Sequence, residues 1–188
     1  MTSYCSVEDV KRYSQIVYSD LGFSDDNEFS NFISNTIIPR ASSIVDSYCG
    51  HDFLLHSVTE KYDGNGTYVL TIRNAPIVSV SYVKKDGEEI DPSEYYAMKT
   101  IIVFKQILEK GFQNYEVSYS YGYSSIPEVI KDVTSRICAN MLQYCVMNKM
   151  GPLIRQGEFK LMIPDQAVLT SDLKALLEPF KIGQWRYA

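Results

Sequence analysis

Long apolar runs are missing from this 188-residue chain. Nowhere do about 18 apolar residues follow one another without a charged or turn-forming residue, and a membrane-spanning helix needs about that length. The N-terminal stretch MTSYCSVEDVKRYSQIV carries charges where a signal peptide has its apolar centre. We therefore expect a soluble, intracellular chain with no membrane partner.

An excess of basic side chains is also missing. The chain has 18 lysine and arginine residues against 23 aspartate and glutamate residues, which gives a formal net charge of -5. A chain of this charge has no overall field that would gather nucleic acid by releasing counterions, so we do not expect a DNA-gripping protein. The composition, 45% hydrophobic and 22% charged, is typical of a globular chain and not of a disordered one.

The cysteines lack the spacing of a metal site or a redox pair. No CxxC occurs, and the four cysteines are Cys5, Cys49, Cys138 and Cys145. The last two fall within an apolar pattern of helical period. We predict that all four are small core side chains kept reduced, with neither a disulfide nor a metal.

Histidine is scarce, which limits the catalytic sites that the chain can form. Its two histidines, His51 and His56, follow Cys49 closely. A small cysteine-dependent enzyme, in which one of them reaches Cys49 as a base, is one alternative function. No nucleophile elbow, glycine-rich nucleotide motif or fourth zinc ligand accompanies them, so we predict no enzyme activity, no cofactor and no metal.

Tyrosine, with 15 residues, is the most unusual excess. Its apolar ring and polar hydroxyl group suit surfaces that become buried on assembly, although strands favour it too. Alternation along NYEVSYSYGY places Tyr115, Val117, Tyr119 and Tyr121 on one face of a strand. A second alternative is therefore a peptide- or glycan-binding module that presents such tyrosines, Tyr123 included. The same face equally fits a core.

The N-terminal part of the chain has a helical pattern. Ser6 and Asp9 have the spacing of a capping-box variant and predict a short helix to about Tyr18. A longer apolar pattern of helical period follows and ends at Gly50. Pro39 lies inside it and removes a backbone hydrogen bond, at a cost of roughly 3 kcal/mol in an ordinary helix interior. We therefore expect either a kink or two helices in tandem.

The middle of the chain, from about Leu54 to Tyr121, changes to a period of two. Its runs SVTEKY, TYVLTI, PIVSVSYVK, TIIVF and NYEVSYSY predict five short strands of an antiparallel sheet. DGNG, at Asp63 to Gly66, lies between the first two runs. It lacks the ligand spacing of a calcium loop and the helix that follows a phosphate loop. We predict a hairpin turn.

A second helical zone follows the strands. Ser125 and Glu128 have the spacing of a capping box, with Pro127 in the first turn. The helix should pack on the long N-terminal helix through an apolar stripe: Ile130, Val133, Ile137, Met141, Tyr144 and Cys145. GPLIRQGEFKLMIPDQAVL is predicted to be irregular or weakly extended, and TSDLKALLEPF to be a short capped helix stopped by Pro179.

The order of these pieces resembles a known family. SVEDVK, SIVDSYCGHDF, YDGNGTYVLTIRNAPIVSVSYVKKDG, YSYGYSSIPEVIKDVTSRICANML and LKALLEPFKIGQW follow one another along the chain. This order of motifs is similar to that in the head-tail connector proteins, also called adaptor or head-completion proteins, of long-tailed bacteriophages, prophages and gene transfer agents. Each motif alone is weak evidence for the family. Their order and spacing, from about Ser6 to Trp185, carry the resemblance.

The resemblance implies a structural role in the virion. Family members form a ring, commonly of twelve subunits, between the portal protein and the stopper or tail-completion protein. They complete the head and create the surface on which the tail docks. For this chain it implies a homo-oligomeric ring at the head-tail interface, made in the host cytoplasm. Genome DNA would pass through its lumen without specific binding.

The resemblance also implies a fold and a docking site. The implied fold is α+β, a helical core in which the long N-terminal helix packs on a C-terminal helix, with an inserted antiparallel β-sheet and an extended C-terminal tail. As one connector domain, the chain would have helical parts at 1–53 and 123–150, a β insertion at 54–122 and a tail with a short helix at 151–188.

The family's C-terminal segment reaches the portal, and a short capped helix with aromatic residues near a chain end suits such an anchor. The alternative is that the tail folds back on its own core. The implied docking residues are Leu173, Leu176, Leu177, Pro179, Phe180 and Trp185.

Overall fold

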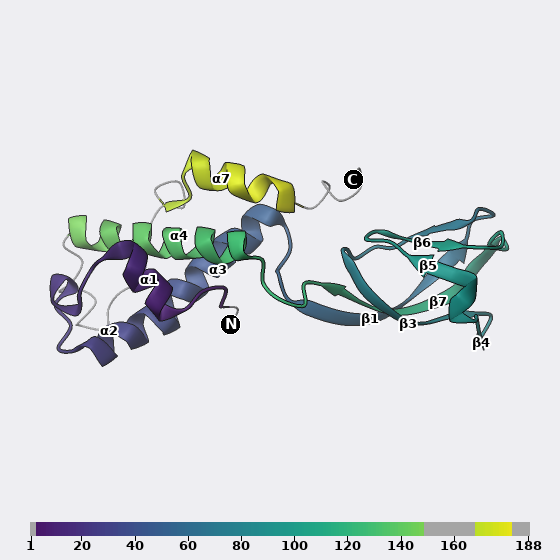
Figure 1. Ribbon diagram of the computed structural model, residues 1–188, viewed down its shortest axis with the longest axis horizontal. Coiled ribbons are helices and arrows are strands. Elements are labelled where there is room, and N and C mark those ends of the chain that lie inside the picture. The colour runs from purple at the N-terminus through teal and green to yellow at the C-terminus, as the bar shows by residue number, and fades with distance from the viewer. Residues whose placement is uncertain (1–2, 149–167, 182–188) are drawn as a thin grey trace. The chain divides into compact units, whose positions relative to one another are not determined.

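The computed structural model describes residues 3–148 and 168–181, and the chain divides into two compact units (Figure 1). The helical unit contains the described residues of 1–51 and 126–181, and the β unit contains 52–125. Helices and strands are segregated, so the predicted α+β class is confirmed. The irregular path predicted before Val168 and the position of Trp185 lie outside the described residues.

Helix α1 (Val7–Ser14) begins at the predicted capping box. The Asp9 N–H donates to Ser6 Oγ at 3.2 Å, and the Ser6 N–H donates to the Asp9 carboxylate at 3.3 Å. The helix ends earlier than predicted because Gln15 adopts a left-handed conformation, with φ 54°. A short 3₁₀ turn, η1 (Tyr18–Leu21), follows.

The predicted long N-terminal helix consists of segments in tandem. Helix α2 (Asp26–Phe32), a π-helical segment η2 (Ile33–Ile37) and helix α3 (Ile38–Cys49) follow one another directly. Pro39 lies in the first turn of α3, where a proline fits, and the π turn before it accommodates the lost hydrogen bond. The helix is therefore irregular near Pro39, as predicted, but its segments follow one another without a break. Gly50 ends α3 with φ 82°, as predicted.

Helix α4 (Glu128–Met147) is the longest helix described and packs on α1 and α3. This packing on the N-terminal helices was predicted. The predicted capping box of Ser125 and Glu128 is wrong, because Pro127 takes the N-cap position and Glu128 is already the first helical residue. The predicted stripe is buried except for the half-buried Tyr144: Ile130, Val133, Ile137, Met141 and Cys145.

The described part of the β unit contains two antiparallel sheets, of strand order β1-β7-β3-β4 and β2-β6-β5. Sequence periodicity predicted five strands in one sheet. It missed β4, which is only two residues long, and β5, which directly follows a 3₁₀ turn. The strands are β1 (Leu55–Gly64), β2 (Val69–Thr71), β3 (Ile77–Lys85), β4 (Glu88–Glu89), β5 (Tyr95–Ala97), β6 (Ile101–Phe104) and β7 (Gly111–Gly122).

DGNG is a connection between strands that belong to different sheets, and the predicted hairpin turn is wrong. Strand β1 pairs with β7, while β2 pairs with β6. An added Cβ at Gly64 would lie 1.7 Å from the carbonyl oxygen of Glu109, so the backbones almost touch there. The Gln113 N–H donates to Asp63 Oδ1 at 2.7 Å, and the Gly64 N–H donates to Asn114 Oδ1 at 2.8 Å.

The β unit has one apolar core, which contains both tyrosine and aliphatic side chains. The buried core residues of the β unit are Tyr62, Leu70, Ile72, Val83, Ile102, Phe104, Leu108, Tyr115, Val117 and Tyr119.

No helix within residues 3–148 and 168–181 has the length and apolarity needed to cross a bilayer.

Candidate docking site

The predicted docking residues lie on helix α7 (Ser171–Leu177) and the 3₁₀ turn η4 (Glu178–Phe180). Thr170 takes the N-cap position in an extended conformation, and its carbonyl accepts the Lys174 N–H at 3.0 Å. The α-helix ends before Pro179, so the predicted short helix and its stop are observed, whereas the predicted cap is not, because the Thr170 side chain makes no capping hydrogen bond.

One side of α7 is buried in the helical unit. Leu173 and Leu177, one turn apart, are 1% and 0% exposed, and α7 packs on α4 and α3. The Asn140 side-chain amide donates to the Val168 carbonyl at 2.9 Å and attaches the start of this segment to α4. At these two leucines the segment folds back on its own core, which was the alternative to an extended anchor.

Four side chains close the end of α7 onto the end of α3; we call them the clasp, comprising Tyr48, His51, Glu178 and Lys181. The Tyr48 hydroxyl group and Lys181 Nζ each lie 3.0 Å from Glu178 Oε2. Lys181 Nζ also lies 4.2 Å from the centre of the Tyr48 ring. His51 Nε2 donates to the Phe180 carbonyl at 2.7 Å.

The clasp also sets the protonation of its charged members. Hydrogen bonds from Lys181 and then from Tyr48 lower the pKa of Glu178 below its ordinary value of 4.5. The same contacts raise the pKa of Lys181, first through Glu178 and then through Tyr48. Both groups are therefore charged at neutral pH. The clasp could not be predicted from the sequence, because its members are far apart along the chain and no local pattern links them.

Only part of the predicted set of docking residues faces solvent. Leu176 is 41% exposed, Pro179 is exposed and Phe180 is half-buried. These three side chains, which we call the docking patch, are the described residues of the predicted set that a partner can reach. Trp185 lies outside the described residues.

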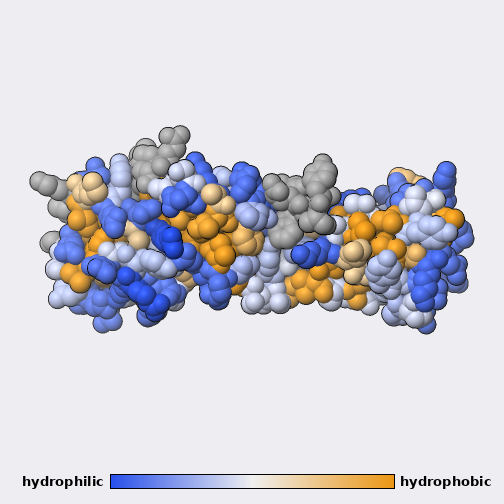
Figure 2. Space-filling view, turned by 45° about the horizontal axis from the view of Figure 1, so that its top comes forward, coloured by the Kyte–Doolittle hydropathy of each residue, from blue (hydrophilic) through white to orange (hydrophobic). Residues whose placement is uncertain are grey.

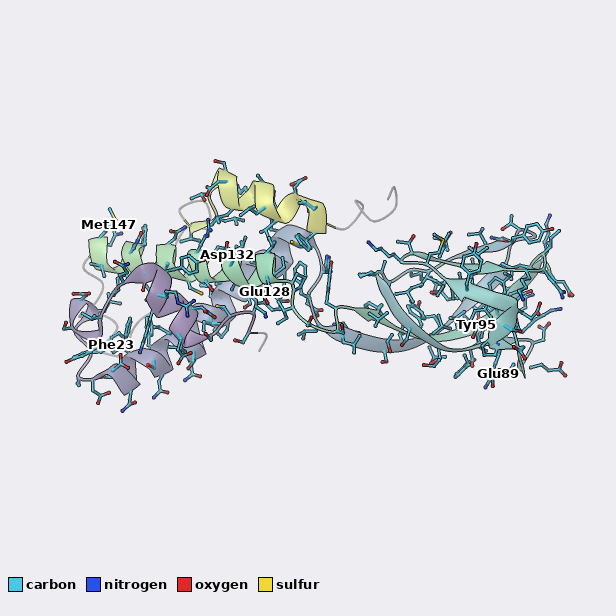
Figure 3. All side chains as sticks on the ribbon, in the orientation of Figure 1. Phe23, Glu89, Tyr95, Glu128, Asp132 and Met147 are labelled. Atoms are coloured by element: carbon cyan, nitrogen blue, oxygen red, sulfur yellow. The ribbon has the colours of Figure 1, made fainter. Side chains whose placement is uncertain are left out.

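A second polar cluster attaches α1 to α4 near the surface. The Tyr13 hydroxyl group donates to the Asp132 carboxylate, and Arg136 Nη2 lies 3.0 Å from Asp132 Oδ2. Asp132 is labelled on α4 in Figure 3. The Arg136 guanidinium group lies over the Tyr13 ring at 5.6 Å. The hydrogen bond to Asp132 raises the pKa of Tyr13. This cluster is a structural contact between two helices.

The geometry around Cys49 disfavours the enzyme alternative. Burial, followed by the nearby charge of Asp46, raises the pKa of the Cys49 thiol to about 12, whereas a nucleophilic cysteine needs a lowered pKa. His51 is bonded to the Phe180 carbonyl, and His56 Nε2 lies 2.7 Å from Asp52 Oδ1. Within the described residues, no group of three or more histidine, cysteine or acidic side chains is arranged to hold a metal ion.

The tyrosine-rich face of β7 is core. Tyr115, Val117 and Tyr119 are buried between the sheets, and Tyr121 is half-buried against the same core. The Tyr119 hydroxyl group donates to the Glu60 carboxylate at 2.7 Å. These rings therefore offer little surface to a sugar or peptide, which disfavours the binding-module alternative.

The sequence model of the family described as head completion protein matches residues 4–147. The chain belongs to the head completion protein family. The match includes all described elements from α1 to α4 and ends before α7, so the docking patch lies outside it. The predicted family resemblance and the predicted structural role in completing a phage-like head are confirmed at this level.

The chain also resembles a solved structure. A chain from the neck of an empty GTA (gene transfer agent) particle, computed with C6 symmetry, aligns with a TM-score of 0.53 and 12% sequence identity. The alignment covers 93% of this chain and 88% of the other. At this low identity the similarity shows a shared fold. A comparison with curated proteins returns no significant match.

Proposed function

We propose that this protein forms a ring at the head-tail interface of the virion and completes the head so that a tail can dock. The family match over residues 4–147 carries the proposal, because it includes the whole β unit and the helical unit as far as the end of α4. In this role the chain is made in the host cytoplasm and is incorporated as a structural part of the neck, without catalytic activity.

The ring is suggested by a solved structure of the same fold. A chain of the same fold comes from a particle neck computed with C6 symmetry. A ring of twelve subunits contains a six-fold axis, so it is compatible with such a neck. Repeating one heterologous contact around a closed ring lets individually weak contacts reinforce one another.

The portal protein is the proposed partner of the docking patch. Leu176, Pro179 and Phe180 present apolar surface on a segment that the clasp and the buried leucines hold against the helical unit. A rigid apolar patch loses little conformational entropy on binding. Trp185 would extend this contact, and Leu173 and Leu177 would act indirectly by holding the helix.

The stopper or tail-completion protein would bind the ring on the side away from the portal. Genome DNA would pass through the lumen without specific binding, because a chain with a net charge of -5 has little overall attraction for a polyanion. A lumen lined by lysine and arginine would contradict this part of the proposal.

Deletion and addition of the protein test the function. Heads are produced from a genome that lacks the gene for this chain, and purified wild-type protein is then added together with tails. We expect heads without the protein to remain tailless and addition to restore tail attachment. Tails that attach equally well without the protein would contradict the proposal.

The Leu176→Asp variant tests the docking patch separately. Because Leu176 faces solvent, the charge should leave folding intact and weaken binding of the protein to portal-bearing heads. The matched control is Glu8→Gln, which alters an exposed charge in the first turn of α1, away from the patch. Equal binding of Leu176→Asp and wild type would exclude the patch as the portal contact.

A further inference from the structure

The three-stranded sheet β2-β6-β5 has apolar side chains on both of its faces. Leu70, Ile102 and Phe104 point into the core of the β unit, and Tyr95, labelled in Figure 3, packs against the same core. Their sequence neighbours must point the other way, because side chains alternate along a strand. An antiparallel sheet with one solvated face normally carries polar side chains there.

The opposite face carries apolar side chains in register. Val69 pairs with Val103, Val103 pairs with Tyr96, and the Met98 N–H donates to the Ile101 carbonyl at 2.8 Å. We call these five residues the outer face. None of them belongs to the core of the β unit or to the partly buried residues packed against it.

The outer face is accessible to a partner. Tyr96 is 57% exposed and Met98 is 52% exposed, while the three aliphatic side chains are half-buried. Figure 2, in which the top of the molecule comes forward, shows hydrophobic residues gathered on the β unit.

The other sheet of the same unit provides a contrast. On its solvent-facing side, the hydroxyl groups of Ser57 and Ser120 lie 2.9 Å apart, and Thr59 donates to Ser118 at 3.1 Å. The outward side of that sheet therefore carries hydroxyl groups beside the exposed Leu55, whereas Thr71, paired with Ile101, is the one polar residue of the described strands on the outer face. Solubility alone does not require tyrosine, methionine and valine side by side on the outer face, and a small apolar patch suits one contact of a larger interface.

We propose that the outer face packs against a neighbouring copy of this chain. The inference rests on the proposed ring and adds the surface through which neighbours meet. In a heterologous contact, the outer face of one copy meets a different surface of the next, and repetition of that contact closes the ring.

The size of the face favours a ring neighbour over a free dimer partner. Three strands at their normal spacing and about three residues in length present a footprint on the order of 150 Å². A stable two-body interface buries about 800 Å² on each partner. The outer face is therefore too small to hold a partner by itself, and it suits a contact that is repeated and supported around a closed assembly.

Charge also favours a second copy of this chain as the partner of the outer face. Lys99 follows Met98 at one end of the face and is exposed, and no carboxylate within residues 3–148 or 168–181 forms an ion pair with it. The described residues of the helical unit contain more acidic than basic side chains, eleven against seven. A second copy can therefore bring a carboxylate to Lys99. Nucleic acid is a poor occupant, because its phosphates would lose water against an aliphatic surface.

Photo-cross-linking identifies the occupant directly. Tyr96 is replaced by the photoreactive amino acid p-benzoylphenylalanine, the protein is incorporated into particles, and irradiated products are analysed by mass spectrometry. We expect a covalent dimer of this chain. A product that contains the portal or a tail protein in its place would overturn the inference, as would the absence of any dimer in particles that contain the ring.

A charge substitution provides the second test. Tyr96→Glu should reduce the number of copies in particles by about tenfold or more, because each closed contact in the ring is weakened. The control is Ser81→Glu, which places the same charge at an exposed position on β3 of the other sheet. Thermal unfolding of both purified variants checks that each one folds.

The two proposals fail in different ways. If wild-type protein never enters particles, the proposed function is wrong. If wild-type and Tyr96→Glu proteins enter particles equally, the proposed function stands and the outer face is not the contact between neighbours.

Discussion

Leu176 and Leu177 are neighbours in sequence with opposite environments. Leu177 is fully buried on α4 and α3, whereas Leu176 faces solvent. We predict that Leu177→Ala lowers the free energy of unfolding of the helical unit by about 2–5 kcal/mol, as expected for a buried leucine. Leu176→Ala should change it by less than about 0.5 kcal/mol. Urea unfolding, followed by a probe in the helical unit, measures both values.

This pair separates stability from docking. The function of Leu176 should appear only in binding to heads, and that of Leu177 mainly in stability. Similar losses of stability in the two variants would mean that α7 does not have the observed orientation on the helical unit.

Glu178 gives the clasp a dependence on pH. Its pKa is lowered in the folded chain, so its contribution to stability is present above the ordinary value of 4.5. The contribution is lost as the pH falls from about that value through the lowered folded pKa. We predict that wild type is more stable than Glu178→Gln at pH 7 and that the difference disappears in acid.

The measurement is the free energy of unfolding of the two proteins between pH 7 and pH 3. Tyr48→Phe is a useful companion, because it removes one hydrogen bond to Glu178 and leaves the contact with Lys181 in place. A difference between wild type and Glu178→Gln that grows in acid would contradict the assignment.

At the scale of elements, local signals predicted helices better than strand partners. The Ser6 capping box and the position of Pro39 involve residues close in sequence, and the structure confirms what they predicted. The prediction of a capping box at Ser125 was wrong because the helix starts later, with Pro127 at the N-cap position. The hairpin at DGNG was wrong because strand pairing depends on distant partners in β6 and β7.

Gly64 tests the observed role of DGNG. An added Cβ would collide with the Glu109 backbone, and backbone cannot move aside as a flexible side chain can. We predict that Gly64→Ala destabilises the β unit by about 3 kcal/mol or more, at the upper end of the cost of overpacking. The control is Gly87→Ala, at φ 92° with nothing within 4 Å, which should cost only the backbone strain of about 1–2 kcal/mol.

Thermal unfolding of the β unit, followed by near-UV signals from its tyrosines, compares the two glycine variants. If Gly64→Ala proved no more destabilising than Gly87→Ala, the close approach between DGNG and Glu109 would not exist in solution.

At the scale of the whole molecule, the order of weak motifs predicted the family correctly, whereas exposure of the candidate docking residues was not predictable. Leu173, Leu176 and Leu177 are the same residue type in one short helix. Only the packing of α7 on α3 and α4 decides which of them faces solvent. The apolar outer face was missed for a related reason, since β5 and its pairing with β6 were not predicted.

The central claim is that the protein forms a ring in the neck of the virion and completes the head. Cryo-electron microscopy of necks from particles with and without the gene for this chain tests it most directly. We predict a ring of density, fitted by the helical unit and the β unit, that lies between portal and tail and disappears with the gene. Necks that show the same density in both kinds of particle would contradict the claim.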